Sequence, residues 1–343
     1  MEGDAPDDLL RERAQQSKLK LWLLMEADRA VVTGLLMGVV FVVLVLTGYL
    51  YPSSVAAIQS SDSTDTLFQG LLTGTITSVT LVVTLNQLVL SQELGAVGDQ
   101  RERMEGAKQF RSDVADAIGA PVSPARPAQF LRALVQVSGE KAETLKAGRS
   151  DRADASLESS IEDLTGSLIA NAAQVSTGLD EARFGSFDVI SSALNFNYSW
   201  KLFTAERIRE RHRQSLNETR LDALDELIEV LGLFGPAREH FKTLYFQWDL
   251  INLSRRILAA AVPALLVSSG MIIFFSDTAY SFSVVGVETL VLVISTAATV
   301  SLLPFLVLLA YIMRIATVAK HTLSIGPFIL RETEDVADVE WDQ

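Results

Sequence analysis

The chain of 343 residues contains no cysteine, which excludes disulfide bonds, thiolate nucleophiles and zinc or iron–sulfur sites with cysteine ligands. Histidine is almost as scarce. The three imidazoles, His212, His240 and His321, are widely spaced, as is typical of unrelated surface residues rather than of a metal site. The sequence therefore predicts no metal and no cofactor.

Basic residues are also few, since 29 Lys and Arg stand against 42 Asp and Glu and the formal net charge is −13. Affinity for nucleic acids comes chiefly from a surplus of basic side chains, so we expect no nucleic acid partner. The acidic excess, together with the preference for Arg over Lys, is similar to that of prokaryotic proteins adapted to a salt-rich cytoplasm. GC-rich codon usage is the alternative explanation of the Arg preference.

Signatures of enzymes are missing from the sequence as well. It has no P-loop, GxGxxG, HExxH or GxSxG motif, no zinc-ligand spacing and no EF-hand loop. The apolar stretches described next hold no paired acids and no nucleophile beside a base. We therefore expect a protein that is not an enzyme. A secondary transporter is disfavoured too, because such proteins usually carry broken helices and charges at the middle of the membrane.

Long apolar stretches are what the sequence does contain, and its mean hydropathy is +0.27 although 21% of its residues are charged. Four stretches are long enough to cross a hydrocarbon core of about 30 Å as helices. They are Val31–Tyr51, Leu67–Gln92, Ile257–Phe275 and Val284–Met313. The fourth would be about 45 Å long as a helix, so we expect it to tilt, to bend at Pro304, or to project into the cytoplasm.

The basic residues beside these stretches indicate their orientation. Arg29 precedes the first stretch, Arg101 and Arg103 follow the second, Arg255 and Arg256 precede the third, and Arg314 and Lys320 follow the fourth. The two connecting loops, Pro52–Thr66 and Asp277–Ser283, contain no Lys or Arg. Because basic residues concentrate on the cytoplasmic side, we expect both termini and the central segment to lie in the cytoplasm of a cell-membrane protein.

The predicted fold class follows from these spans. We expect an all-α, polytopic membrane protein in which four transmembrane helices form two hairpins flanking a helical cytoplasmic domain. The predicted segments are a cytoplasmic N-terminal segment (1–30), a first transmembrane hairpin (31–92), the helical cytoplasmic domain (93–256), a second transmembrane hairpin (257–313) and a cytoplasmic acidic C-terminal tail (314–343).

The central segment reads as helical almost throughout, because it is rich in Ala, Leu, Glu, Arg and Gln. Three prolines predict a linker at 119–127, and further breaks are expected near 148–151, at Gly185 and at 235–236, with 188–213 as one helix. From Pro236 no breaker interrupts the pattern into the third span. Gly95 and Gly98 are hinge candidates after the second span, as is Pro304 within the fourth. The aromatic residues between 187 and 248 suit either a helical core or a binding pocket.

The second span carries a polar pattern that bears on function. Six polar side chains recur at alternating intervals of four and three residues, which places them on one stripe of a helix. The stripe consists of Thr73, Thr77, Thr80, Thr84, Gln87 and Ser91. Thr75, Ser78, Asn86 and Gln92 broaden it. A hydroxyl or amide that faces lipid loses its hydrogen bonds with water, so this face must meet protein or water.

Two interpretations of the stripe compete. In the first, Ser and Thr allow helices to approach closely, with Gly34–Gly38 and Gly70–Gly74 as small-residue packing faces. In the second, copies of this helix from several subunits line a hydrated pathway for ions, which requires a homo-oligomer. Glu288, in the outer part of the fourth span, is then a candidate for the outer mouth of the pathway. Its alternative is an interfacial position at the headgroups.

The arrangement of two hairpins around helical cytoplasmic material is similar to that of the bestrophin anion channels. That resemblance is one of architecture, and it assigns no residue of this chain. The leading hypothesis is a homo-oligomeric channel or pore for small ions that is coupled to its cytoplasmic domain. The alternative is a non-conducting membrane scaffold or signalling protein whose cytoplasmic helices bind a protein partner. Either protein would contact membrane lipid.

Overall fold

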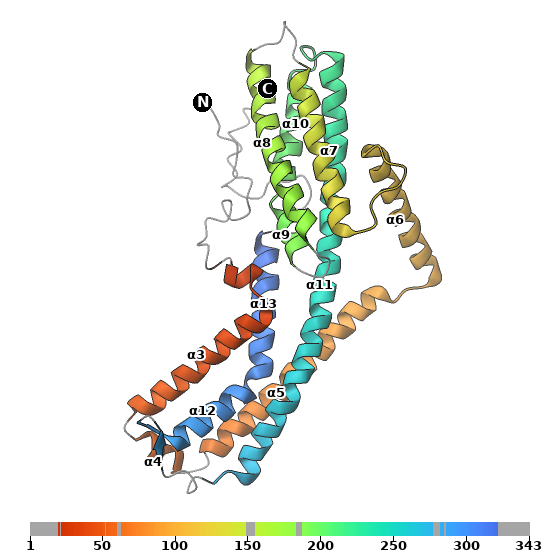
Figure 1. Cartoon of the computed structure of the whole chain (residues 1–343). Coiled ribbons are helices and arrows are strands. Elements are labelled where there is room, and N and C mark those ends of the chain that lie inside the picture. The colour runs from red at the N-terminus through yellow and green to blue at the C-terminus, as the bar shows by residue number, and fades with distance from the viewer. Residues whose placement is uncertain are drawn as a thin grey trace, which may run out of the picture. The chain divides into compact units, whose positions relative to one another are not determined.

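The computed structural model of the chain describes residues 20, 22–51, 53–59, 63–148, 155–182, 187–276, 282–284 and 286–321. These residues are nearly all helical, as good helix formers and long apolar runs favour. A π-helical turn, Trp22–Glu26, precedes the α-helices (Figure 1). The α-helices are α3 (Arg29–Leu50), α4 (Ser54–Gln59), α5 (Ser63–Glu93), α6 (Val97–Ala117), α7 (Pro127–Ala147), α8 (Ala155–Glu181), α9 (Asp188–Leu194), α10 (Tyr198–Arg211), α11 (Glu218–Phe274), α12 (Thr289–Ser301) and α13 (Leu303–His321).

The chain divides into two compact units. The central unit is built on Gly95–Phe246, and the apolar unit is built on Leu23–Leu94 together with Gln247–Thr317. Helix α11 passes from the central unit into the apolar unit without a break. The prediction that helix continues from Pro236 into the third apolar stretch is therefore confirmed.

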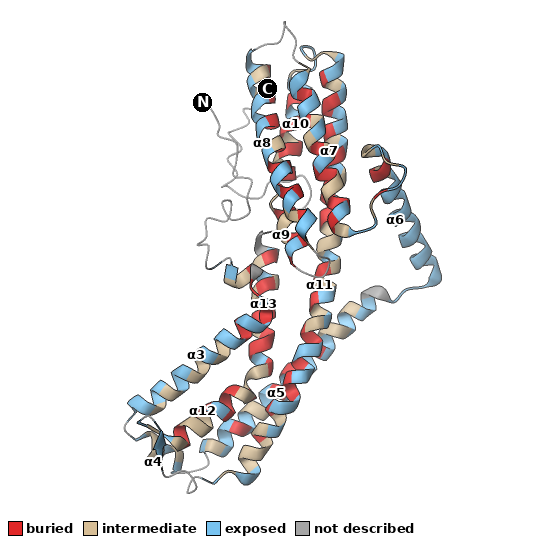
Figure 2. Ribbon diagram, in the orientation of Figure 1, coloured by how far each residue is buried: buried red, intermediate tan, exposed pale blue. Residues whose placement is uncertain are grey.

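The central unit is a helical bundle. Helices α7, α8 and α10 and the first part of α11 run side by side and turn their buried residues toward one another (Figures 1 and 2). Phe196, Tyr198 and Phe234 lie in this core, with ring centroids 4.8 Å apart for Phe196–Phe234 and 5.7 Å apart for Tyr198–Phe234. These aromatic side chains therefore serve as helix packing, which was one of the two interpretations of the sequence.

A buried ion pair also fixes the central unit. The guanidinium of Arg220, only 1% exposed, donates to both carboxylate oxygens of Glu158 at 2.6 and 3.1 Å. The Asn217 side chain accepts from the backbone N–H of Arg220 and donates to the carbonyl of Gly148. These contacts join the start of α11 to α8 and to the end of α7.

Two predicted breaks in the central unit are confirmed. The linker at 119–127 separates α6 from α7, where Gly119 has a φ of +64° and Pro127 is the first residue of α7. Helix α7 ends at Ala147, in agreement with the break expected near 148–151. Gly185 lies outside the described residues, between the end of α8 and the start of α9.

Two other predictions for this segment are wrong. Residues 188–213 do not form one helix, because the chain leaves helical geometry at Asn195–Asn197, where the Asn171 amide donates to the Asn195 carbonyl at 2.8 Å. Nor does a break occur at 235–236, since α11 continues through Pro236. Gly235 instead permits a close approach to Tyr198, because a Cβ at that position would lie 2.8 Å from the Tyr198 ring.

The apolar unit contains helices that could cross a membrane. Helices α3, α5 and α11 each contain an apolar stretch of sufficient length, and the bent pair α12–α13 makes a fourth span if it is counted as one. Helix α12 packs against both α3 and α5. Helix α4 lies within the loop that was predicted between the first two spans.

The fourth apolar stretch is bent, which is one of the three alternatives expected from its length. Helices α12 and α13 meet at an angle of 51° across Leu302, two residues before Pro304, whose missing N–H cannot continue the hydrogen bonding of α12. Its first residues are not helical, which corrects the prediction. Strands β1 (Ser283–Val284) and β2 (Val287–Glu288) pair as an antiparallel hairpin, with Gly286 at a φ of +80°.

The hinge candidates Gly95 and Gly98 are separated by the structure. Gly95 lies in the non-helical segment Leu94–Ala96, between α5 and α6. Gly98 lies inside the first turn of α6. Ala96, in extended conformation, precedes the first residue of α6.

Candidate functional site: the two polar faces of α5

All six residues of the predicted stripe are exposed, and their spacing places them on one face of α5. The opposite face is buried and includes Phe68 and Val82, both with no exposed surface. Phe68 packs with α12 residues and Val82 with residues of α11 and α13. At 100° per residue, the stripe is centred on the side of α5 directly away from this packing face. The stripe is therefore left uncovered by the rest of the described chain.

The exposed polar stripe is longer than the predicted one, which begins at Thr73. Thr66 and Gln69 are also exposed, and they precede Thr73 by seven and four residues, so intervals of three or four residues extend back to Thr66. The periodic signal was present in the sequence. Thr66 lies in the predicted loop before the span, and Gln69 lies inside the predicted span but outside the predicted stripe. With these two residues, the polar face covers most of the length of α5.

The hydroxyls of Thr73, Thr77, Thr80 and Thr84 each donate to a carbonyl of the preceding turn. The distances are 2.9 Å from Thr73 to Gln69, 2.9 Å from Thr77 to Thr73, 2.9 Å from Thr80 to Ile76 and 3.0 Å from Thr84 to Thr80. The Ser91 hydroxyl donates to the Leu88 carbonyl at 2.7 Å. Each hydroxyl proton is thereby satisfied within α5 itself.

The residues that were expected to broaden the stripe lie on the other face. Thr75 and Ser78 are buried, and the Thr75 hydroxyl is 3.4 Å from the carbonyl of Ser301 at the end of α12. The side-chain oxygen of Asn86 accepts from Ser254 of α11 at 2.7 Å. These residues therefore belong to helix packing and not to the stripe. The Gln92 side chain lies outside the described residues.

Hydroxyls also join the other helices of the apolar unit. Ser268 of α11 donates to the hydroxyl of Ser301 at 2.9 Å, and both side chains are buried. Ser295 and Thr299 are buried on α12, and Thr299 donates to the Ser295 carbonyl. The small and polar residues on these faces allow close contact between helices, as the packing interpretation expected of such residues.

The glycine pairs show a different pattern. A Cβ added at Gly34, Gly38, Gly70 or Gly74 would meet no described atom within 4 Å, apart from its own helix and chain neighbours. The two glycine faces that were considered as packing surfaces are therefore not packed by the described part of the same chain.

Glu288 is exposed and is the residue before the first turn of α12, at the end of β2. The prediction that it lies inside a transmembrane helix is wrong, because the hairpin around Gly286 delays the start of the helix.

The apolar unit contains a buried cluster of charged residues that was not predicted from the sequence. Arg29, the first residue of α3, and Arg314, which lies within α13, are 3% and 7% exposed. The Arg29 guanidinium donates to the carbonyls of Ala27 and Ala310, each at 3.1 Å, and that of Arg314 donates to Ala27 at 2.7 Å. These bonds hold the start of α3 against α13.

Asp249 of α11 completes this cluster and is 3% exposed. One of its carboxylate oxygens is buried with no hydrogen-bond donor among the described residues. Burial raises the pKa of the Asp249 carboxyl above its ordinary value, and the positive charges of Arg314, Arg29 and Arg256 oppose that rise. Arg256 also lies 3.8 Å from Asp28, in an exposed pair. The feature of the sequence that could have indicated this cluster is an acidic residue two helical turns before the third apolar stretch.

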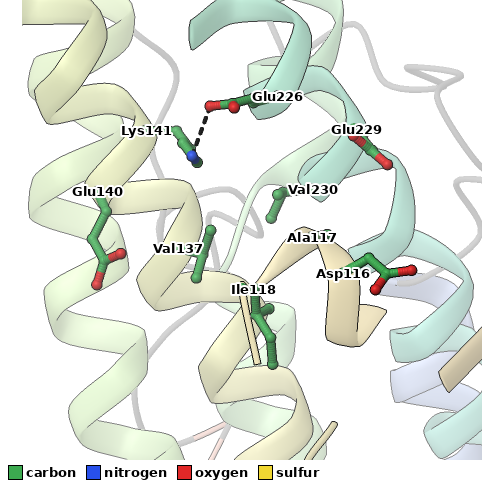
Figure 3. Close-up of a pocket in the computed structure, with 10 residues that line it drawn as sticks. Asp116, Ala117, Ile118, Val137, Glu140, Lys141, Glu226, Glu229 and Val230 are labelled. Carbon is green, nitrogen blue, oxygen red and sulfur yellow. Dashed lines mark ion pairs between the residues drawn. The ribbon is translucent and has the colours of Figure 1, made fainter. Parts of the chain in front are cut away.

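The central unit has a shallow pocket of about 330 Å³ between the end of α6, α7 and α11 (Figure 3). Asp116, Glu140 and Glu229 line it, and Lys141 pairs with Glu226 at 2.6 Å. Within the described residues, no group of three His, Asp or Glu is placed to hold a metal ion. His240 is exposed, His212 is partly buried, and the His321 side chain lies outside the described residues.

The fold defines a nearly all-helical protein with three to four helices that are long and apolar enough to span a membrane. The chain belongs to a family of unknown function, DUF7972, whose profile matches residues 1–343. No curated protein matches the chain. No solved structure matches it either, so the resemblance to the bestrophins stays an expectation from the pattern of spans.

Proposed function

We propose that the chain forms a homo-oligomeric membrane channel or pore for small ions, in which α5 from several copies lines a water-filled pathway. In this proposal α3, α5, the second part of α11 and the bent pair α12–α13 are four spans in two hairpins. Both termini and the central unit lie on the cytoplasmic side, because the basic residues flank the spans there.

The observation that carries the proposal is the polar stripe on the face of α5 that points away from the rest of its own unit. Gln69 and Gln87 are central to it, because an amide has two donors and an acceptor and cannot be satisfied by the preceding turn as threonine is. Exposure of such a group to hydrocarbon costs several kcal/mol, of the order of 2–7 for each unpaired amide. Water or polar groups of another chain must therefore cover the stripe.

Isolated threonines give a useful comparison. Thr47 of α3 and Thr296 of α12 are also exposed, and each donates to the carbonyl four residues earlier at 2.7 Å. A single back-bonded threonine is thus compatible with a lipid-facing position. The stripe differs because eight polar residues follow one another along one face, and because two of them are amides.

An oligomer follows from the position of α5. One chain with three or four spans cannot enclose a pathway when the polar face lies on the outside of its helix packing. Copies related by cyclic symmetry would bring their α5 stripes to a common axis. The uncovered glycines Gly70 and Gly74 flank the stripe and would let neighbouring helices approach closely.

The other candidate residues take subsidiary roles in the proposal. Glu288 is an exposed carboxylate directly before the first residue of α12 and remains the candidate for an outer mouth. Gly95 lies in the interruption that follows α5, and Pro304 follows the bend between α12 and α13, so both are hinge candidates for gating.

The lack of native cysteine makes a direct test possible. Single variants Thr77→Cys, Thr80→Cys and Thr84→Cys of the full chain are reconstituted in liposomes, and ion flux is measured before and after a membrane-impermeant thiol reagent. The matched control is Thr47→Cys on α3. Thr47 is exposed as well, and its hydroxyl also donates to the carbonyl four residues earlier.

We expect flux through the unmodified protein and a clear change of flux on modification at the three α5 positions, with no change at position 47. Absence of flux, together with protection of all four thiols, would contradict the proposal. That outcome would favour the alternative, a non-conducting scaffold or signalling protein with a cytoplasmic partner.

A further inference from the structure

The hydrogen bonds of the stripe determine which polar groups it offers to the outside. A threonine hydroxyl has one donor hydrogen and two acceptor lone pairs. In Thr73, Thr77, Thr80 and Thr84 the hydrogen is directed to a carbonyl of α5, at 2.9 to 3.0 Å. What remains on the exposed side is an oxygen that only accepts, together with a methyl group.

The backbone adds no donor to this face, since the N–H groups in the middle of a helix are used in its own hydrogen bonds. The stretch from Thr73 to Thr84 therefore presents the negative ends of a row of dipoles over about 16 Å. The amides of Gln69 and Gln87, which both donate and accept, lie beyond its two ends. Helix α5 contains Asp65 and Glu93 but no Lys or Arg.

We infer that the threonine segment Thr73–Thr84 makes the pathway selective for small cations over anions. This inference rests on the proposed function and names the class of ion that it conducts. Neutral oxygens replace part of the hydration shell of a cation, as carbonyl oxygens do in known cation filters. An anion needs donors in the same place, and the hydroxyls of this segment have none left to offer.

The test is the reversal potential of the reconstituted full chain under a gradient of potassium chloride. The expected sign is that of a cation-selective pathway. In the double variant Thr77→Val/Thr80→Val, each valine keeps the shape of threonine and removes its oxygen. We expect the ratio of cation to anion permeability to fall by about fivefold or more, the factor that corresponds to one lost hydrogen bond.

The matched control is Thr47→Val/Thr296→Val, which removes two exposed, back-bonded hydroxyls from α3 and α12 and is expected to leave the ratio unchanged. A reversal potential of the opposite sign in the unmodified protein would overturn the inference while leaving the proposed function intact. An unchanged ratio in the α5 variant would also overturn it. Absence of any current would overturn the proposed function itself and this inference with it. Because the sign in the unmodified protein is decisive, the test does not depend on the folding of the variant.

Discussion

The side-chain oxygen of Asn86 accepts a hydrogen bond from the hydroxyl of Ser254 at 2.7 Å, so a polar contact joins α5 to α11 inside the apolar unit. The next residue, Gln87, points to the exposed face of α5. Two adjacent amides therefore have different surroundings, and the difference separates the structural role of one face from the role proposed for the other.

Replacement of Asn86 should affect the stability of the protein, whereas replacement of Gln87 should affect ion flux. Asn86→Leu removes the bond to Ser254, and interhelical hydrogen bonds of this kind contribute on average about 0.6 kcal/mol and at most about 1.7 kcal/mol in membrane proteins. We expect lower thermal stability in detergent, and a double-mutant cycle with Ser254→Ala should give a coupling energy in that range. Gln87→Leu should alter ion flux while leaving the stability of the protomer unchanged. Equal losses of stability in both variants would contradict the assignment of the two faces.

The contact of α3 with α12 should be sensitive to a single methyl group. A Cβ at Gly48 would clash with Cγ1 of Val291, a buried and stiff β-branched side chain. Gly48→Ala should therefore lower the free energy of unfolding by about 1–3 kcal/mol.

The control for this prediction is Gly38→Ala on the same helix, where a Cβ meets no described atom within 4 Å. Its thermal stability in detergent should be unchanged or slightly higher, because alanine has the better helix propensity. Addition of Val291→Ala to Gly48→Ala should recover most of the loss. A loss that persists in the double variant would contradict the proposed contact.

The stability of the protein should depend on pH through Asp249, which lies two turns before the third predicted span. Burial raises its pKa above the ordinary value of 3.8, although Arg314, Arg29 and Arg256 act in the opposite direction. The protonated carboxyl is thus favoured by the folded state. The contribution of the protonated Asp249 carboxyl to the stability of the folded state is fully present below pH 3.8. It is lost as the pH rises through the folded-state pKa.

Asp249→Asn replaces the carboxylate by a neutral group of the same shape. At pH 7 we expect a higher melting temperature than that of the unmodified protein, with a difference that shrinks as the pH falls toward 4. The measurement is thermal unfolding of both proteins in detergent between pH 4 and pH 8. Lower stability of the asparagine variant at pH 7 would mean that attraction to the arginines outweighs the burial of the carboxylate.

Apolar length was a reliable guide to the apolar unit. Uninterrupted runs of apolar residues in α3, α5 and α11 indicated helices long enough to span a membrane, since only helical hydrogen bonding satisfies such a backbone. Proline was a less reliable guide. Pro304 accompanies a bend, but Pro236 lies inside a continuous helix, directly after Gly235, which packs closely on Tyr198.

The candidate site could be predicted in its periodicity but not in its surroundings. Intervals of three and four place Thr73 and Thr80 on one stripe, yet the spacing does not reveal which side of the helix the rest of the chain covers. Thr75, Ser78 and Asn86 were grouped with the stripe because polarity alone does not separate a packing face from an exposed one. The cluster of Arg29, Arg314 and Asp249 was missed for a similar reason, because its members are brought together only by tertiary packing.

The central claim is that the exposed face of α5 meets water in the membrane. The most direct measurement is the labelling of single-cysteine variants by a membrane-impermeant maleimide in intact membranes, with Thr80→Cys as the reporter. Ser78→Cys on the buried face of α5 and Thr47→Cys on exposed α3 are the controls. The account predicts rapid labelling at position 80 and protection at positions 78 and 47, whereas protection at all three positions would contradict it.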